Sequence, residues 1–138
     1  MKVLTYLSFP GNCADALKFY ESAIGARIKT LVPVKGSPLE KDLPPAMRDK
    51  VLHAEFEIGT DTLMASDALG EGAAPAMSGF SVTLNTDTPK EAERLFAALA
   101  MGGKITMPLA ETYWAHRFGM LVDRYGMPWM FNCAKPMA

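Results

Sequence analysis

The sequence predicts an α+β protein made of two tandem strand–helix–strand–strand–strand modules, which form a curved mixed sheet around a concave cavity with the helices on its convex side. The main observation is an internal repeat, because the pattern from Asn12 to Tyr20 recurs from Thr88 to Phe96. The offset is constant, since 88 − 12 and 96 − 20 both give 76. The second observation is that each copy holds one helix-type pattern among several strand-type patterns. We therefore expect an internal duplication of one small module.

Each copy begins with a helix start signal. Asn12 and Thr88 are residue types favoured at the N-cap, an acid follows each of them three residues later, and Pro89 suits the first helical position. Apolar residues recur at helical spacing after both signals, and a glycine follows each run. These patterns predict helices over 13–24 and 89–101.

Strand-type alternation accounts for most of the remaining sequence. Within one run, Ala54, Phe56 and Ile58 face one way, and the polar residues between them face the other way. The apolar face should pack on the helices, so the polar face is left to line a cavity. A long polar segment broken by glycine and proline should be a surface loop. The predicted strands cover 3–9, 27–34, 51–58, 62–66, 80–86, 104–107, 118–122 and 127–133, and the loop covers 35–49.

Length and composition indicate one domain. A chain of 138 residues, of which 49% are hydrophobic, is long enough to build a single core. We place the two modules at about 2–67 and 79–134, joined by an Ala/Gly-rich linker at 68–78, within a single domain over 1–138.

Charge and hydropathy disfavour several classes of protein. Fourteen basic and fifteen acidic residues nearly cancel, and no basic run is present, so we expect no nucleic-acid partner. No segment reaches the roughly 20 apolar residues that span a bilayer, so we expect no membrane partner. The apolar start of the chain is interrupted at Ser8 and Pro10, too early for a secretory signal. Two distant cysteines, Cys13 and Cys133, are expected to stay reduced, and the predicted location is cytoplasmic.

Several motifs spread over nearly the whole chain occur together in one known group of proteins. They are Tyr6-Leu7-Ser8-Phe9, Ala16-Leu17-Lys18-Phe19-Tyr20, His53-Ala54, Leu63-Met64-Ala65-Ser66-Asp67, Gly79-Phe80-Ser81, Phe118-Gly119-Met120, and the stretch 123–130. With these motifs the chain resembles the PhnB-like branch of the vicinal oxygen chelate superfamily, which includes glyoxalase I, extradiol dioxygenases, fosfomycin-resistance enzymes and bleomycin-binding proteins. The resemblance implies paired modules around a small-molecule site, and commonly a homodimer.

The resemblance also implies four positions at which metal-using relatives carry His, Glu or Gln ligands. Carried over by spacing, these positions are Tyr6 (or Thr5, with the register open by one residue), Met64, Ser81 and Met130. Phenol, hydroxyl and thioether groups are poor ligands for hard divalent ions. We therefore expect no metal at these positions and no cofactor, and we expect the four side chains to contact a ligand. For the two methionines, filling of the core is the alternative.

Candidate acid–base chemistry is confined to a few residues. His53 and Glu55 share one strand face, so they are candidates for a catalytic pair in the cavity. The alternative is that His53 is a hydrogen-bonded structural residue. A displaced metal site that uses His53, Glu55 and His116 is a further alternative.

Two residues before the last hairpin are further candidates for ligand binding. Trp114 would close over a ligand and Arg117 would meet an anionic group. The alternative is that both residues stabilise the loop and a subunit contact.

Other chemically capable residues are expected to be structural. Asp67 and Asp123 stand beside turns at strand ends, where carboxylates usually accept hydrogen bonds from backbone N–H groups. Cys13 follows the N-cap, where the helix dipole would lower the pKa of its thiol. It lacks an adjacent base, so we do not expect a nucleophile there.

Two functional classes follow. The first is a metal-free protein that binds or sequesters a small organic compound, with a neutral or cationic ligand preferred because the polar face carries Glu55 and Glu57. The second is an enzyme of the lyase, isomerase or oxygenase type that uses His53 and Glu55 or a displaced divalent metal; the sequence leaves this choice open. Sequences of this type are often described as demethylubiquinone methyltransferases. Methyl transfer from S-adenosylmethionine normally uses a doubly wound sheet with a Gly-rich first turn, which this sequence does not predict.

Overall fold

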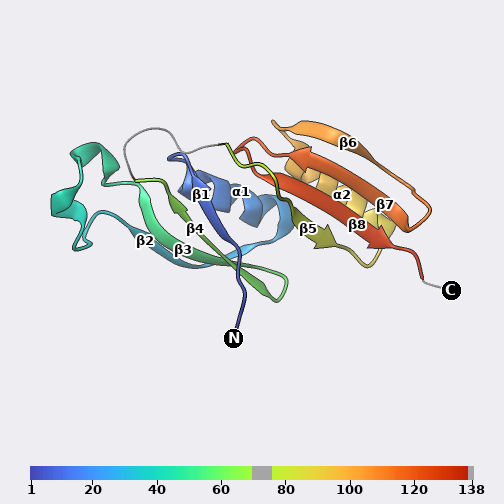
Figure 1. The fold of residues 1–138 in the computed structure, drawn as a ribbon, viewed down its shortest axis with the longest axis horizontal. Helices are drawn as coiled ribbons and strands as arrows, with labels where there is room; N and C mark the ends of the chain where they lie inside the picture. Colours follow the sequence, from blue (N-terminus) through green and yellow to red (C-terminus); the bar gives the residue numbers. More distant parts are fainter. Residues whose placement is uncertain (70–75, 137–138) are drawn as a thin grey trace. The chain divides into compact units, whose positions relative to one another are not determined.

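The computed structural model describes residues 1–69 and 76–136 (Figure 1). The described residues form two α-helices and eight β-strands, so the predicted α+β class is confirmed. The chain divides into two compact units, which we call the first unit (Met1–Pro75) and the second unit (Ala76–Ala138). Each unit contains one strand, one helix and three further strands in that order, as predicted for tandem modules. Residues 70–75 of the predicted linker lie outside the described residues, and the single domain stays a prediction.

The first unit forms one four-stranded mixed sheet with the strand order β1-β4-β3-β2. β1 pairs with β4 in parallel, and the other pairs are antiparallel. The bounds of α1 and β3 agree with the predicted helix and strand. β1 starts later than predicted, because sheet pairing begins where the Met64 N–H donates to the Thr5 carbonyl oxygen. The elements are β1 (Tyr6–Phe9), α1 (Cys13–Ile24), β2 (Arg27–Pro33), β3 (Val51–Ile58) and β4 (Asp61–Asp67), with short 3-10 turns at Glu40–Asp42 and Pro45–Met47 in the long loop.

The second unit repeats this arrangement with the strand order β5-β8-β7-β6. Here β5 pairs with β8 in parallel, and the other pairs are antiparallel. β6 and β7 are longer than predicted, because their hairpin continues to the pair of Ala110 with Phe118 and to an N–H of Thr112 that donates to Ala115. The elements are β5 (Val82–Asn85), α2 (Pro89–Ala100), β6 (Lys104–Ala110), β7 (Ala115–Val122) and β8 (Pro128–Ala134).

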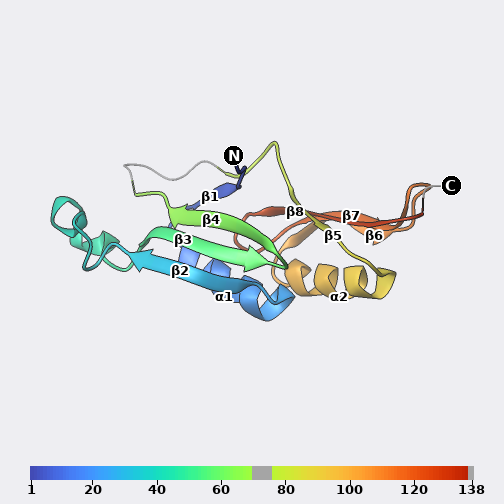
Figure 2. The same cartoon turned by 90° about the horizontal axis from the view of Figure 1, so that it is seen from below.

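Each helix covers one face of the sheet in its own unit (Figure 2). In the first unit, the buried rings of Tyr20 on α1 and Phe56 on β3 stack with centroids 6.2 Å apart. In the second unit, Phe96 on α2 meets Phe131 on β8 edge-on at 5.2 Å. Alternate strand residues are buried beneath the helix, and their neighbours lie on the opposite face. We call this opposite face the open face of each unit.

The two helices start differently, although both have a suitable N-cap residue. The Thr88 hydroxyl accepts a hydrogen bond from the Glu91 N–H at 3.1 Å, as predicted for a cap. Asn12 occupies the N-cap position of α1, but its side chain makes no capping hydrogen bond. The Cys13 N–H donates instead to Asp67 Oδ1 at 2.9 Å. The side-chain cap expected at Asn12 is therefore replaced by a carboxylate from the end of β4.

The two buried aspartates organise the strand ends, which confirms their predicted structural role. Asp67 also accepts from the Val51 N–H at 2.8 Å, so one carboxylate joins α1, β3 and β4. Asp123 accepts from the N–H groups of Tyr125 and Met127 and from the Trp129 indole at 2.8 Å. Within residues 1–69 and 76–136, no helix has both the length and the apolarity needed to span a bilayer.

Replacing Asp123 should strongly destabilise the second unit. Asp123→Ala leaves three buried or partly buried donors without this acceptor, so we expect the free energy of unfolding to fall by about 3 kcal/mol. Urea denaturation measures this loss. The control is Asp87→Ala, because Asp87 is exposed in the same unit, and it should change stability by about 0.5 kcal/mol or less. Equal effects of the two substitutions would contradict the structural role of Asp123.

Candidate functional site

One row of side chains crosses the open face of the first unit. Tyr6 on β1 lies opposite Met64 on β4, and Met64 lies opposite Glu55 on β3. Glu55 in turn lies opposite Thr30 on β2. Three of the residues predicted from the sequence are therefore neighbours on one face, and His53 shares this face because it is two residues from Glu55 on the same strand.

The side chains of Tyr6, His53 and Glu55 form a chain of polar contacts. The Tyr6 hydroxyl lies 3.2 Å from His53 Nδ1, and the two rings stack with centroids 5.8 Å apart and an interplanar angle of 29°. On the other side of the imidazole, His53 Nε2 lies 3.7 Å from Glu55 Oε1. All three side chains stay partly open to solvent, with Tyr6 46% exposed. The predicted His53–Glu55 pair is therefore within ion-pair distance but makes no hydrogen bond, Tyr6 extends the group, and a catalytic role for the pair stays a prediction.

Glu57, the next acid on this face, belongs to a separate ion-pair cluster. Its carboxylate lies 3.3 Å from Lys29 Nζ and 3.0 Å from Arg27 Nη2. Hydrogen bonds from Lys29 and then Arg27 hold the pKa of Glu57 below its usual value. The carboxylate is therefore ionised and paired at neutral pH, and it loses these partners only in acid.

The open face of the second unit carries a row of uncharged side chains. Met130 on β8 lies opposite Thr83 on β5 and opposite Met120 on β7. Met120 lies opposite Met107 on the edge strand β6. Met64 and Met130 therefore hold matching places, because each faces a residue on the parallel first strand of its unit.

This register identifies Thr83 as the counterpart of Tyr6, a residue that the sequence reasoning missed. Ser81 lies two residues earlier on the same face. The first copy has one more residue between Tyr6 and the N-cap Asn12 than the second has between Thr83 and the N-cap Thr88, since 12 − 6 is 6 and 88 − 83 is 5. A comparison of these two connections would have indicated the shift.

A groove of about 610 Å³ lies on the open face of the second unit. Segment 77–80 forms part of its wall, and Ser81, Thr83, Met120 and Met130 are among its other lining residues. None of the lining residues is charged. The groove thus offers hydroxyl groups for hydrogen bonds and thioether and apolar groups for contact, and it contains two of the predicted ligand-binding residues, Ser81 and Met130.

Arg117 lies on the helix side of the sheet, away from this groove. Its guanidinium donates to Glu93 of α2, with Nε 3.0 Å from Oε1. Trp114 meets Tyr113 and Phe118 edge-on, at centroid distances of 4.9 and 5.3 Å, and is 44% exposed. These contacts favour a structural role for both side chains, because Arg117 joins β7 to α2 and Trp114 packs against neighbouring aromatic rings, and their roles in ligand binding stay predictions.

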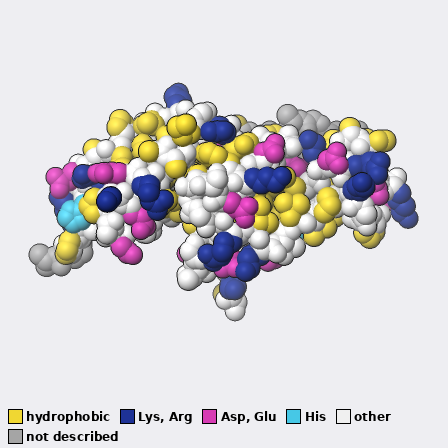
Figure 3. Space-filling model, turned by 180° about the vertical axis from the view of Figure 1, so that it is seen from behind, with side chains coloured by type: hydrophobic (Ala, Val, Ile, Leu, Met, Phe, Trp, Pro, Cys, Tyr) yellow, Lys and Arg dark blue, Asp and Glu magenta, His cyan; other side chains and the backbone are white. Residues whose placement is uncertain are grey.

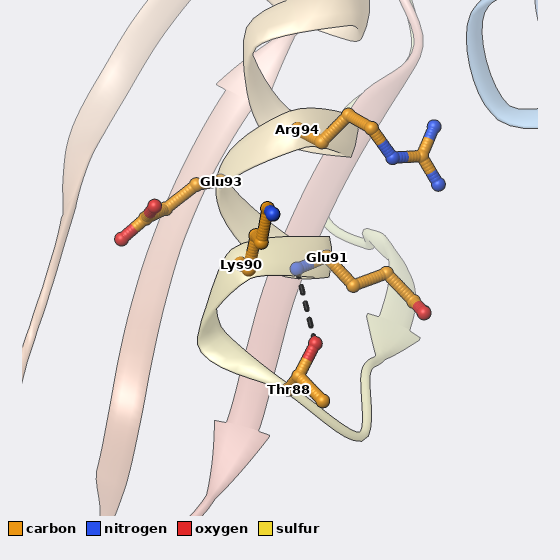
Figure 4. Close-up of a pocket in the computed structure, with 5 residues that line it drawn as sticks. All are labelled: Thr88, Lys90, Glu91, Glu93 and Arg94. Carbon is orange, nitrogen blue, oxygen red and sulfur yellow. Dashed lines mark hydrogen bonds between the residues drawn. The ribbon is translucent and has the colours of Figure 1, made fainter.

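A second hollow, of about 590 Å³, lies beside the first turns of α2. Figure 4 shows its five lining side chains fanning outward from one helix. The hydrogen bond drawn among them is the Thr88 cap of the Glu91 N–H. Because these groups point apart, they do not converge on a ligand. On the face seen in Figure 3, cationic and anionic side chains are interspersed, unlike the basic stripe typical of nucleic-acid binding.

The donor groups at the four expected positions do not fit a hard divalent ion. A phenol, a hydroxyl and two thioethers stand where carboxylates or imidazoles would be needed. Within the described part of the chain, no group of three or more His, Cys, Asp or Glu residues is placed to hold a metal. The residues of the displaced site fall into different units, with His53 and Glu55 in the first and His116 in the second.

Burial and neighbours make Cys13 an inert thiol. The side chain is fully buried, and burial together with the charge of Asp67 raises the pKa of Cys13 to about 12. The expectation that the helix dipole would lower this pKa is therefore wrong, because desolvation and a nearby carboxylate outweigh it.

Paired strand–helix–strand–strand–strand modules with open sheet faces define a protein of the vicinal oxygen chelate fold class. Among solved structures, the chain is similar to protein PA1353 from Pseudomonas aeruginosa, with 40% identity, 99% of each chain covered and a TM-score of 0.88. It is also similar to the PhnB protein from Bacillus cereus, with 27% identity, 97% and 100% coverage and a TM-score of 0.82. The fosfomycin resistance protein FosX from Listeria monocytogenes, at 9% identity, 98% and 93% coverage and a TM-score of 0.66, shares the fold alone.

Sequence comparison then gives the family. The model of the family described as 3-demethylubiquinone-9 3-methyltransferase matches residues 1–131. Protein YjdN from Escherichia coli K12 is 36% identical, with 98% of this chain and 97% of that protein covered. The chain belongs to this PhnB-like family, which confirms the resemblance found in the sequence.

The structure differs from the usual fold of methyltransferases, although the family description names a methyltransferase. Each sheet is mixed, with one parallel pair and two antiparallel pairs. Methyl transfer from S-adenosylmethionine normally uses a doubly wound parallel sheet, which is a different topology. We therefore do not carry methyl transfer over to this chain.

Both cysteines should be unreactive in the folded protein. Cys13 and Cys133 are buried, and Cys13 also has a raised pKa, so we expect almost no labelling by a disulfide reagent at about pH 8. Both should react fully once the chain is denatured, and mass spectrometry of labelled peptides identifies each site. Fast native labelling of Cys13 would contradict its placement.

The same shift predicts a loss of stability in alkali. The folded pKa of Cys13 lies above its ordinary value of 9.0, so its contribution is complete below about pH 9 and is lost as pH rises towards 12. Cys13→Ala should flatten this alkaline decline in urea denaturation midpoints, and an unchanged decline would assign it to other groups.

Proposed function

We propose that the protein binds a small, uncharged organic molecule without using a metal, and that it holds this ligand in the groove of the second unit. The observation that carries the proposal is the uncharged lining of that groove, in which thioether and hydroxyl side chains lie side by side in register. Its volume of about 610 Å³ falls within the range typical of small-molecule sites.

The lining favours a neutral ligand over an ion. A charged ligand would lose hydration in the groove, and no lining side chain carries a compensating charge. The hydroxyls of Ser81 and Thr83 offer hydrogen bonds, and methionine side chains adapt to irregular apolar shapes. An aromatic or alicyclic compound with one or two polar groups matches these features, and sequestration is the simplest role for such a site.

We also propose a second copy of the chain as the protein partner. The resemblance to the superfamily supports this. Each sheet also ends in edge strands, whose unpaired backbone N–H and C=O groups can pair with another chain. Light scattering tests the proposal, because a dimer has twice the mass of one chain.

A charge placed in the groove should weaken binding. We expect Met130→Lys to weaken the affinity for neutral ligands by at least about tenfold, because the new ammonium group must lose hydration when the ligand covers it. Ligands are first found by thermal-shift screening of matched neutral and ionic compounds, and affinities are then measured by calorimetry.

Two control variants accompany this test. Met130→Leu keeps the volume and apolarity of the side chain, so it should retain binding, and Tyr6→Phe changes only the first unit. Ligands that bind Met130→Lys as tightly as the parent protein, or a screen that yields only ions, would overturn the proposal.

An enzyme is the second candidate, and the Tyr6–His53–Glu55 contacts favour it. Elemental analysis and thermal shift with divalent ions distinguish a metal enzyme from a metal-free binding protein and from a metal-free enzyme. Because the four expected ligand positions carry no carboxylate or imidazole, we expect no stoichiometric Mn, Fe, Ni or Zn after purification and no stabilisation by these ions. A stoichiometric, stabilising metal would support the displaced metal site instead.

A further inference from the structure

We propose that Tyr6 is an activated phenol at the outer end of a proton relay formed by Glu55, His53 and Tyr6 on the open face of the first unit. This goes beyond ligand binding, and it does not depend on the groove of the second unit. The relay would transfer a proton to and from a small molecule with an acidic C–H or O–H group.

The relay requires one tautomer of His53. The Tyr6 hydroxyl lies 3.2 Å from His53 Nδ1, and Nδ1 accepts a hydrogen bond from this hydroxyl in the tautomer whose proton is on Nε2. Nε2 faces Glu55 Oε1 at 3.7 Å, and a negative charge at that place favours a proton on Nε2 over one on Nδ1. The lone pair of Nδ1 is thereby kept towards the phenol.

The strand order makes the Tyr6–His53 contact a specific arrangement. β4 lies between β1 and β3, so two strand spacings, or about 10 Å, separate the strands that carry Tyr6 and His53, and His53 is also two residues along β3 from Glu55, which is in register with Tyr6. The two rings meet only because both lean over β4, where they stack as well as hydrogen-bond. Side chains that merely extend into solvent from their strands would not meet at this separation.

The cations near the relay pair with Glu57, so the carboxylate of Glu55 is available to His53. The two cations on the neighbouring strand, Arg27 and Lys29, are engaged by Glu57 at 3.0 and 3.3 Å. Among the described residues, His53 is the one ion-pairing partner found for Glu55. The carboxylate can therefore stabilise a positive charge on the imidazole, which is what proton transfer from Tyr6 would create.

The proposed step balances without an oxidant or a leaving group. As the ligand approaches Tyr6, the phenol proton passes to His53 Nδ1, and Tyr6 Oη takes the acidic proton of the ligand. The ligand becomes an anion and His53 becomes an imidazolium beside Glu55. The reverse transfers return the proton to the same atom or to another atom of the ligand, so the net reaction is proton exchange or isomerisation, as for a small carbonyl compound with an acidic α C–H.

The test measures the nucleophilic reactivity of Tyr6 directly and needs no known substrate. The protein is treated with N-acetylimidazole near neutral pH, and acylation of each tyrosine is followed by peptide mass spectrometry. Tyr113, which is 89% exposed, is the internal reference, whereas Tyr6 is 46% exposed. We expect Tyr6 to react about tenfold faster than Tyr113, because an adjacent base activates a nucleophile. Accessibility alone predicts the opposite order.

Variants then assign the activation to the relay. His53→Gln should bring the rate at Tyr6 down to that of Tyr113 or below, and Glu55→Gln should lower it by a smaller factor, because the carboxylate acts only through the imidazole. Asp61→Asn is the control, since it removes an exposed carboxylate from the neighbouring strand β4 and leaves the ion pairs of Glu57 intact, and it should leave the rate unchanged. Circular dichroism confirms that each variant is folded.

A second measurement reports the tautomer. In ¹⁵N NMR of the folded protein, we expect the Nε2–H form of neutral His53 to dominate, and Glu55→Gln should increase the Nδ1–H form. A rate at Tyr6 equal to or below that of Tyr113, or one that His53→Gln leaves unchanged, would overturn the relay. Either outcome would leave groove binding untouched, because that proposal is tested at Met130 in the other unit.

Discussion

The structure depends on one constraint, which is that a single 12-residue helix covers one face of each four-stranded sheet. Burial of large side chains between helix and sheet, such as Phe56 beneath Tyr20, contributes about 1.5–3 kcal/mol for each side chain. Because side chains alternate along a strand, the residues that build this core also fix the register of the opposite face. The open faces are therefore positioned by the core while their own side chains remain free to vary in chemistry.

Buried aspartates complete this constraint where hydrogen bonding between strands ends. Asp67 accepts N–H groups from the start of α1 and from β3, and Asp123 closes the turn before β8 and holds the Trp129 indole. The oxygens of both carboxylates accept hydrogen bonds from fixed donors. These side chains therefore position the strands and are not available as acids or bases.

The sequence alone predicted much of the fold, because helix caps and strand alternation are local signals. Met64 and Met130 are expected at ligand positions for a different reason, which is the spacing carried over from the family that the chain resembles. The sequence could not supply the strand order, so nothing in it indicated that Tyr6 reaches His53 across β4. The register shift between Ala115 and Arg117 was likewise hidden, and that shift accompanies the placement of Arg117 beside Glu93 on the helix side.

The charge state of Cys13 shows a second limit of local reasoning. A position after the N-cap favours a thiolate, but that argument assumes solvent around the sulfur. In the fold, the side chain is buried. Asp67, which is 54 residues away in the sequence, accepts a hydrogen bond from the Cys13 N–H. Desolvation and this long-range neighbour outweigh the dipole, and neither is visible as a pattern in the sequence around Cys13.

The two open faces share a topology but differ in what charges they can stabilise. On the first, Tyr6, Met64 and Glu55 stand in one row, and a carboxylate is available to compensate a protonated imidazole. On the second, the equivalent row holds Thr83, Met130 and Met120, none of which stabilises an ion by charge. Proton transfer needs titratable groups that lie near a compensating charge. Tight contact with a neutral molecule is favoured where charged groups are absent, because the ligand would remove them from water. The same strand order therefore presents titratable side chains on one face and uncharged side chains on the other, and the difference resides in only a few side chains of each row.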